Sequence, residues 1–230
     1  IAGNTFDYPA LHGQAIMSAG YSFVSASKSA AVEGELLNTD DYSAVDLILG
    51  KEKQTKLGRP GVTPLRFKTF DTDLQKSITT YCKNGGRIFA SGSYIASDLW
   101  FNPLAPAKDS DKVFAQDILK YKWRDNRAAI DGKIKFSASP LTTKEGEFTY
   151  YNTPNEESYV VESPDAIEPA DSCAYTALRY SENNLSAGIV FGGSEQDHWR
   201  TVVFGFPFES LKGDTVRNAL MKEILDFLLK

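Results

Sequence analysis

Apolar residues along the first part of the chain alternate between helix-like and strand-like spacing. Helical spacing covers residues 9–19, which begin with Pro9 and end before Gly20. A strand is expected at residues 21–27 and a second helix at 30–36. The apolar run at 44–49 ends in Gly50, which is typical of a strand buried on both faces. Strand alternates with helix here, and this order predicts an α/β fold.

The clearest helix is expected to begin after Asp71 or Thr72 as N-cap and to stop at Gly85. Its apolar residues follow i, i+4, i+7 and i+8 spacing, namely Leu74, Ile78, Tyr81 and Cys82. An apolar strand at 87–94 comes directly after it. Strand, helix and strand in this order imply parallel pairing through a right-handed crossover.

The middle of the chain has a different pattern. A helix is expected at 113–121, followed by short strands at 133–137, 147–151 and 158–161 that Pro, Gly and Asn separate. We interpret residues 133–172 as an antiparallel β excursion inserted into the same domain. Strands at 175–180, 187–191 and 201–206 and a helix after Asp214 complete the chain. The predicted fold is a single α/β domain, residues 1–230, with a doubly wound, mostly parallel sheet.

Composition narrows the range of partners and cofactors. The formal net charge of -5 disfavours nucleic acid, since such binding relies on Lys and Arg. No apolar run is long enough to span a bilayer, so no membrane insertion is expected. With two cysteines, Cys82 and Cys173, and two histidines, His12 and His198, we expect neither a metal site nor a cofactor. The mixed segment Glu195-Gln-Asp-His198 is better explained as a solvated loop, and His12 as a packed helix residue.

Ligands of open parallel sheets bind beyond the carboxyl ends of the strands. This rule selects four segments, at 50–53, 91–94, 192–198 and 206–209. The residues that we expect to line a ligand cleft are Gly50, Lys51, Glu52, Lys53, Ser91, Ser93, Tyr94 and Glu209.

Four segments also carry a resemblance to a known superfamily. They are Asp46-Leu-Ile-Leu-Gly50, Asn84-Gly-Gly86, Arg87-Ile-Phe-Ala-Ser-Gly-Ser-Tyr94 and Phe204-Gly-Phe-Pro-Phe-Glu209. Their order resembles the class I glutamine amidotransferase-like domains, which have a flavodoxin-like sheet. More narrowly, Gly3-Asn-Thr-Phe-Asp-Tyr-Pro9 and Gly205-Phe-Pro-Phe-Glu-Ser210 are similar to segments of exported Bacteroidetes proteins labelled xanthan lyases.

The resemblance implies an exported protein, in the periplasm, on the cell surface or outside the cell, in which other domains accompany this one. Similar domains begin with an apolar strand before the segment that matches residues 3–9. We therefore expect a central strand of the sheet to come from upstream or from a separate segment. Polysaccharide lyases of the xanthan type have a helical toroid and β-sandwiches, which this pattern does not resemble, so the label carries little weight for this segment.

Active amidotransferases place a nucleophilic Cys after the strand that matches 87–90 and a His near the chain's end. Here those positions hold Ser91-Gly92-Ser93 and Phe206-Pro207-Phe208-Glu209. Cys82 cannot substitute, because its spacing predicts the buried face of a helix. The alternative is a hydrolase in which Ser91 or Ser93 attacks and His198 is the base, oriented by Glu195, Asp197 or Glu209.

Two basic segments suggest a ligand. The first contains Lys51, Lys53, Lys56, Arg59, Arg66 and Lys68, and the second is Lys120-Tyr-Lys-Trp-Arg124. They predict binding of an acidic polysaccharide, with the alternative that the aromatics pack inward and the cations face water. Eight acids between Lys144 and Arg179 are interpreted as a solvated face. The favoured function is a non-catalytic binding or architectural module of a glycan-handling protein; the alternative is a hydrolase or a component of a polysaccharide-degrading enzyme.

Overall fold

The computed structural model describes residues 8–56, 58–59, 65–103 and 107–230. Its centre is a seven-stranded sheet with strand order β1-β4-β11-β10-β9-β6-β7. In chain order these strands are β1 (Val45–Gly50), β4 (Arg87–Gly92), β6 (Lys133–Phe136), β7 (Glu147–Thr149), β9 (Ala174–Tyr180), β10 (Ser186–Phe191) and β11 (Arg200–Phe204). Two small ribbons lie outside it, one of β2 (Thr55–Lys56) and β3 (Leu65–Arg66), the other of β5 (Tyr121–Asn126) and β8 (Asp165–Pro169).

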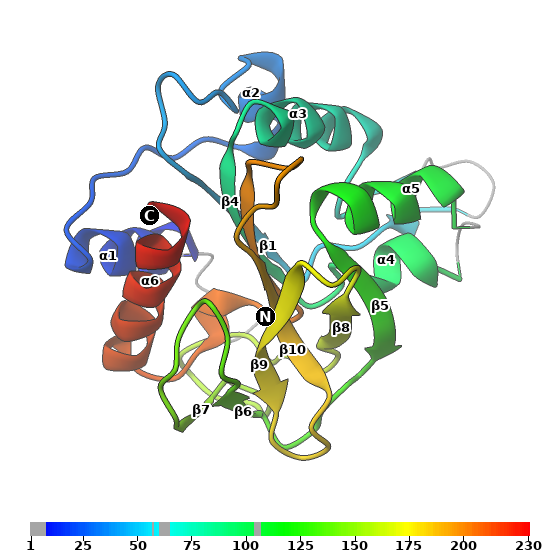
Figure 1. Ribbon diagram of the computed structural model, residues 1–230. Helices are drawn as coiled ribbons and strands as arrows, with labels where there is room; N and C mark the ends of the chain where they lie inside the picture. The colour runs from blue at the N-terminus through cyan, green and yellow to red at the C-terminus, as the bar shows by residue number, and fades with distance from the viewer. Residues whose placement is uncertain (1–7, 57, 60–64, 104–106) are drawn as a thin grey trace.

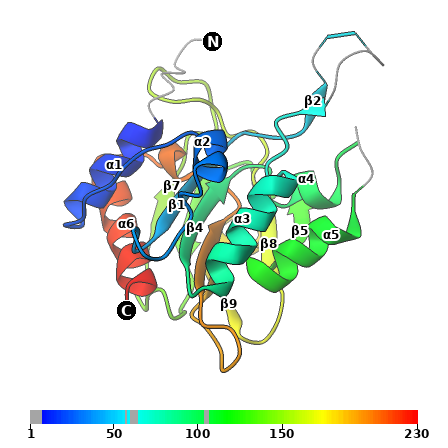
Figure 2. The same cartoon turned by 90° about the horizontal axis from the view of Figure 1, so that it is seen from above.

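Helices cover both faces of the sheet (Figure 1, Figure 2). On one face α1 (Tyr8–Ser18) packs beside α6 (Asp214–Leu228). The other face carries α3 (Thr72–Lys83), with α2 (Lys28–Glu33), α4 (Ser97–Trp100) and α5 (Asp109–Val113) near it. The π-helical turn η1 (Phe114–Ile118) continues α5, and the 3-10 turn η2 (Phe208–Ser210) precedes α6. This two-sided cover confirms the predicted α/β class.

The sheet is mixed in strand direction. β1, β4 and β11 pair in parallel, with Val45 beside Ile88 and Arg200 beside Arg87. All other pairings in the sheet, from β11 through β10, β9 and β6 to β7, are antiparallel. The short connections before and after β10 account for the antiparallel pairing of β9, β10 and β11, because a tight turn joins antiparallel neighbours whereas parallel strands need a long crossover. The predicted parallel, doubly wound arrangement therefore describes the β1-β4-β11 part of the sheet.

Alternating side chains of β4 supply the two cores. Phe89 points to the α1 and α6 side, whereas Ile88 and Ala90 point to the α3 side. Helix α3 has the predicted boundaries: Asp71 caps it by accepting the N–H groups of Asp73 and Leu74. All four apolar residues predicted for its inner face, Leu74, Ile78, Tyr81 and Cys82, are buried.

Several predicted elements differ from the structure. Residues 21–27 form no strand, because they pair with none of the described strands, and Tyr21, Phe23 and Val24 are exposed. Residues 158–161 likewise form no strand. The helix predicted at 113–121 covers only the end of α5 and η1, because Lys120 takes a left-handed conformation and the chain turns into β5. β6 and β7 of the expected 133–172 insertion extend the main sheet, and its β8 pairs with β5.

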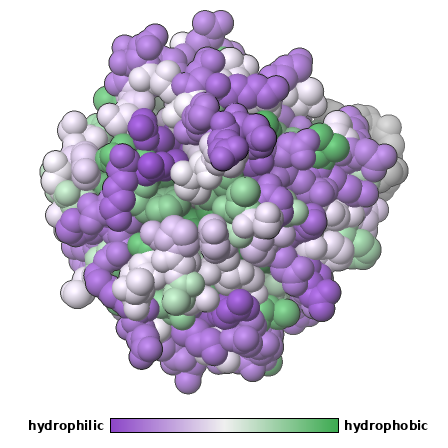
Figure 3. All heavy atoms as spheres, viewed as in Figure 1, coloured by the Kyte–Doolittle hydropathy of each residue, from purple (hydrophilic) through white to green (hydrophobic). Residues whose placement is uncertain are grey.

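β1 is the end strand of the sheet within the described part of the chain. The additional central strand expected from the resemblance stays a prediction. The face of the molecule drawn in Figure 3 is mostly hydrophilic, with a smaller apolar area in a hollow near its middle. Among the described helices none has the length and apolarity to cross a membrane.

Candidate functional site

The carboxyl ends of β1 and β4 meet at two buried glycines. Gly50 lies beside Gly92 in the parallel ladder, and the N–H of Ser93 donates to the Gly50 carbonyl at 2.8 Å. The ladder shifts register between Ile48 and Gly50, and Gly50 has a φ of 50°. A side chain would be strained in this left-handed conformation, so glycine suits the turn that leaves β1.

A buried charge cluster lies next to Gly50, and it consists of His12, Asp46, Glu209 and Tyr159. The His12 Nδ1 atom is 2.7 Å from Asp46 Oδ2, and its Nε2 atom is 3.2 Å from Glu209 Oε2. The Tyr159 hydroxyl donates to Glu209 Oε1 at 2.7 Å. His12 and Glu209 are 1% and 0% exposed, so both charges are withdrawn from water. Four separate parts of the chain are joined here.

Local structure explains how these side chains meet. Asp46 is the second residue of β1 and faces the α1 side, while η2 after Pro207 presents Glu209 to the same place. The His12 ring packs 4.7 Å from the Phe208 ring and 6.3 Å from the Phe89 ring, measured between centroids. These aromatic neighbours exclude water and strengthen the electrostatic interactions between the charges.

The cluster fixes the protonation state of His12. Burial alone would lower the pKa of the imidazole, but Asp46 and Glu209 outweigh it and raise the pKa of His12 to about 9. At neutral pH the ring is therefore an imidazolium that donates from both nitrogens. A general base must be able to accept a proton near the working pH, so His12 in this state cannot act as one.

The two candidate serines are shut off from solvent. Ser91 is 0% exposed and its Oγ accepts the N–H of Phe208 at 3.3 Å, while Ser93 is 1% exposed. The Ser93 Oγ atom has no hydrogen-bond partner in the described part of the protein. No histidine nitrogen is within hydrogen-bonding distance of either hydroxyl among these residues. Neither serine is thus paired with a base.

His198 lies at the opposite end of the sheet from the serines. It is exposed in the connection between β10 and β11, two residues before Arg200, which pairs with Arg87 at the amino end of β4. Ser91 pairs with Phe204, four residues further along β11, or roughly 13 Å along the strand direction. The segment 192–198 was expected at the carboxyl ends, but β10 runs antiparallel to β11 and places it at the amino ends. Glu195 and Asp197 lie in the same connection, at the amino ends of β4 and β11.

Other expected cleft residues form a rim beside Gly50. The Lys51 ammonium bonds to the carboxylate of Glu162 and, at 2.9 Å, to the Val160 carbonyl. The Tyr94 hydroxyl donates to Glu162 at 3.4 Å, and the Lys53 ammonium lies 4.3 Å from the centre of the Tyr94 ring. The structure therefore brings Gly50, Lys51, Lys53, Tyr94 and Glu209 to one edge. Glu52 instead bonds to Lys28, at 2.6 Å.

Acidic residues pair with four of the nine cations in the two predicted basic segments. Ion pairs join Lys51 to Glu162, Lys68 to Asp111, Arg124 to Glu168, and Lys120 to Asp197 and Asp171. Three of these acids belong to the stretch interpreted as solvated, which here supplies counterions. Tyr121 is fully buried and Trp123 is half-buried, so the aromatics pack inward as the alternative interpretation held. Lys56 and Arg66 sit on the β2-β3 ribbon. Arg59 is exposed in the connection between these two strands.

Asp165 is a further buried acid that the sequence interpretation placed on the surface. It is 0% exposed, and its Oδ2 atom accepts the N–H groups of Ala96 and Ser97 at 2.8 and 2.7 Å. Burial raises the pKa of Asp165 to about 7, although these two N–H groups lower it. The acid thus ties β8 to the beginning of α4.

Sequence interpretation missed three members of the buried charge cluster as site residues: His12, Asp46 and Tyr159. A signal existed for Asp46, since a charged residue inside an apolar strand requires a buried partner. His12 is one of two histidines in the chain and was the natural candidate for that partner. Nothing local distinguishes Tyr159. The described residues contain no group of three or more His, Cys, Asp or Glu that could hold a metal ion.

Comparison with known proteins gives little further guidance. No protein-family model matches the chain, and no curated protein matches it. Among solved structures, the exo-β-1,4-mannosidase Op5Man5 from Opitutaceae bacterium strain TAV5 is similar at 13% identity with a TM-score of 0.41. The similarity covers 69% of this chain but only 23% of the mannosidase. Likeness of this degree does not establish a common fold or activity.

Proposed function

We propose that this chain is a non-catalytic module, related to the glutamine amidotransferase-like domains with a flavodoxin-like sheet. It serves binding or architecture in an exported protein that handles glycans. The family rests on the resemblance of residues 46–50, 84–94 and 204–209, and the exported location on that of residues 3–9 and 205–210. The absence of catalysis is inferred from the site itself.

The observation that carries the proposal is the placement of His12 between the carboxylates of Asp46 and Glu209. His12 is the histidine that contacts Glu209, the acid retained in the Pro and Glu pattern of the late segment. An imidazolium between two carboxylates is a structural ion pair, since removing its proton would leave buried Glu209 and half-buried Asp46 without a positive partner. The arrangement joins α1, β1 and η2, and both ring nitrogens of His12 are engaged by carboxylates, which leaves His12 no role as a base.

The buried serines support the same conclusion. A nucleophile must reach its substrate, and Ser91 and Ser93 are closed to solvent. Cys82 is 0% exposed in α3, and burial raises its pKa to about 12, so it is not a thiolate at neutral pH. The hydrolase alternative needs His198 as base, and His198 lies at the other end of β11.

Glutamine hydrolysis and labelling by a fluorophosphonate test the proposal. We expect no glutaminase activity and no labelling above that of Ser91→Ala, Ser93→Ala and His198→Ala variants. Labelling that disappears in one serine variant and falls in His198→Ala would show that the domain is a serine hydrolase. Circular dichroism of each variant separates loss of labelling from loss of fold.

A further inference from the structure

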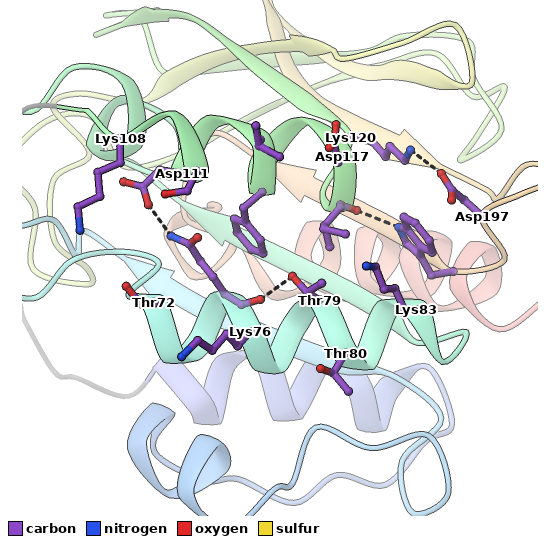
Figure 4. A pocket seen from close by; sticks show the side chains of 16 residues that line it. Thr72, Lys76, Thr79, Thr80, Lys83, Lys108, Asp111, Asp117, Lys120 and Asp197 are labelled. Atoms are coloured by element: carbon purple, nitrogen blue, oxygen red, sulfur yellow. Dashed lines mark hydrogen bonds and ion pairs between the residues drawn. The ribbon is translucent and has the colours of Figure 1, made fainter.

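A groove crosses the α3 side of the molecule, away from the buried charge cluster. It has a volume of about 840 Å³ and lies between α3 on one wall and α5 with η1 on the other (Figure 4). Lys108 lies at the end of the groove where α3 begins, and Lys83 lies at the end of the groove where α3 ends (Figure 4). α3 spans the 12 residues 72–83, or roughly 18 Å at 1.5 Å per residue, so the groove suits an extended ligand.

The walls of this groove hold cations that no acid neutralises. Lys83 and Lys108 belong to none of the ion pairs among the described residues, and Lys76 meets only the exposed Asp73 at 3.6 Å. The acids Asp111 and Asp197, which also line the groove, are already bonded to Lys68 and Lys120. Asp117 is the unpaired acid of the walls within the described part of the chain. The free charges of the groove are therefore mainly positive, although the whole chain carries -5.

The floor and walls indicate the kind of chain that fits. Phe114 and Ile118 form an apolar floor, each 6% exposed, and Thr80 and Ser110 add exposed hydroxyls. Both walls are helical, and their backbone groups are used within the helices. One way in which an extended peptide gains affinity is by pairing with a free sheet edge, and these helical walls offer none. A sugar chain can place apolar ring faces on the floor and hydroxyls against the walls.

We propose that the groove between α3 and η1 binds an extended acidic polysaccharide, with carboxylates meeting Lys108 at one end and Lys83 at the other. This inference rests on the proposed binding role. It places the acidic-glycan site in the groove rather than on the basic segments 51–68 and 120–124, where Lys51, Lys68, Lys120 and Arg124 are paired with acids. The π-helical turn shapes one wall, and such turns are frequent at functional sites.

Affinity electrophoresis with polygalacturonate in the gel tests the proposal, with its methyl-esterified form as the uncharged comparison. We expect retardation by the acidic polymer alone, weakening as salt rises because these exposed charges are screened. The double variant Lys83→Ala/Lys108→Ala should bind roughly tenfold more weakly, as expected for two exposed charge contacts. The Asp117→Asn variant should bind more tightly, because it removes an opposing charge from the wall.

A matched control is Lys56→Ala/Lys122→Ala, which removes two exposed lysines that lie outside the groove and belong to no ion pair among the described residues. It has the same net charge as the groove variant. Equal weakening in both double variants would show general charge attraction and overturn the groove assignment. So would wild-type binding by the groove variant or an absence of binding. Tighter binding of poly-L-glutamate through the same lysines would assign the groove to acidic peptides instead. None of these results alters the fluorophosphonate test, so failure of the groove and failure of the non-catalytic role are distinguishable.

Discussion

The charge on buried His12 makes stability depend on pH in a direction that can be calculated. The imidazole pKa is 6.5 in an unfolded chain and about 9 in the folded one. Each pH unit of that difference corresponds to about 1.4 kcal/mol, so the charged ring favours the folded state by about 3 kcal/mol. Because the folded pKa is the higher one, this contribution is complete below pH 6.5 and is lost as pH rises through about 9.

The measurement is urea unfolding of the wild type and of His12→Gln between pH 6 and pH 10. Gln cannot carry the charge, so subtraction of its free energy of unfolding removes other titrating groups, Asp165 included. We expect this difference to shrink by about 3 kcal/mol across the range, which moves the wild-type urea midpoint by roughly 1 M relative to the variant. In a His198→Ala background His12 is the remaining histidine, and NMR can follow its titration directly.

Two results would refute this account of the buried charge cluster. One is a stability difference that stays constant from pH 6 to pH 10. The other is an NMR titration of His12 below pH 7, which would return a neutral imidazole and reopen a role for it as a base. Asp46→Asn supplies the internal check, since loss of the nearer carboxylate should lower the His12 pKa while the ring keeps a hydrogen-bond partner.

Three further predictions follow from particular sites. Native protein should react with Ellman's reagent at exposed Cys173 but not at Cys82, which should react only after unfolding, because Cys82 is buried and its pKa is raised to about 12; rapid modification of both would show that α3 opens easily. Gly205→Ala should lower the free energy of unfolding by more than about 3 kcal/mol or prevent folding, since its Cβ would lie 2.0 Å from the Asp165 carbonyl oxygen; a wild-type thermal midpoint would contradict this. The free energy of unfolding of the wild type, relative to that of Asp165→Asn, should fall as pH rises from about 4 to about 7. The reason is that burial raises the Asp165 pKa from 3.8 to about 7, so the folded state resists ionisation of this acid. Urea unfolding measures this difference, which would not change with pH if the acid were solvated.

Sequence patterns predicted the elements whose own residues determine them. Helix α3 has its cap, its inner face and its end within one segment, and all three are where the spacing puts them. The directions of β9 and β10 depend instead on which strands they pair with. Continuing the parallel pattern from β1 and β4 placed the 192–198 connection at the wrong end of the sheet.

The candidate site was predictable where the residues follow strand ends directly. Gly50, Lys51 and Tyr94 could be placed from β1 and β4 alone, and Glu209 from the turn after β11. The partners of these residues come from α1 and from the 158–162 connection, at sequence separations of up to 197 residues. No local pattern encodes such pairings. The sequence indicates these pairings only through Asp46, which is an acid within the otherwise apolar strand β1.

The two ends of β11 separate the residues that the hydrolase alternative would need to bring together. Serines, an acid and a histidine are all present, but Ser91 pairs with Phe204 and His198 precedes Arg200, so the length of a strand separates nucleophile from base. The histidine that does reach the acid is held as a cation by a second carboxylate from β1. Asp46 is therefore the residue that decides the role of the cluster: with it, His12 stabilises the fold as a charged ring. Without it, a single carboxylate beside a histidine would resemble the orienting pair of a hydrolase, although the buried serines would still lie out of reach of substrate.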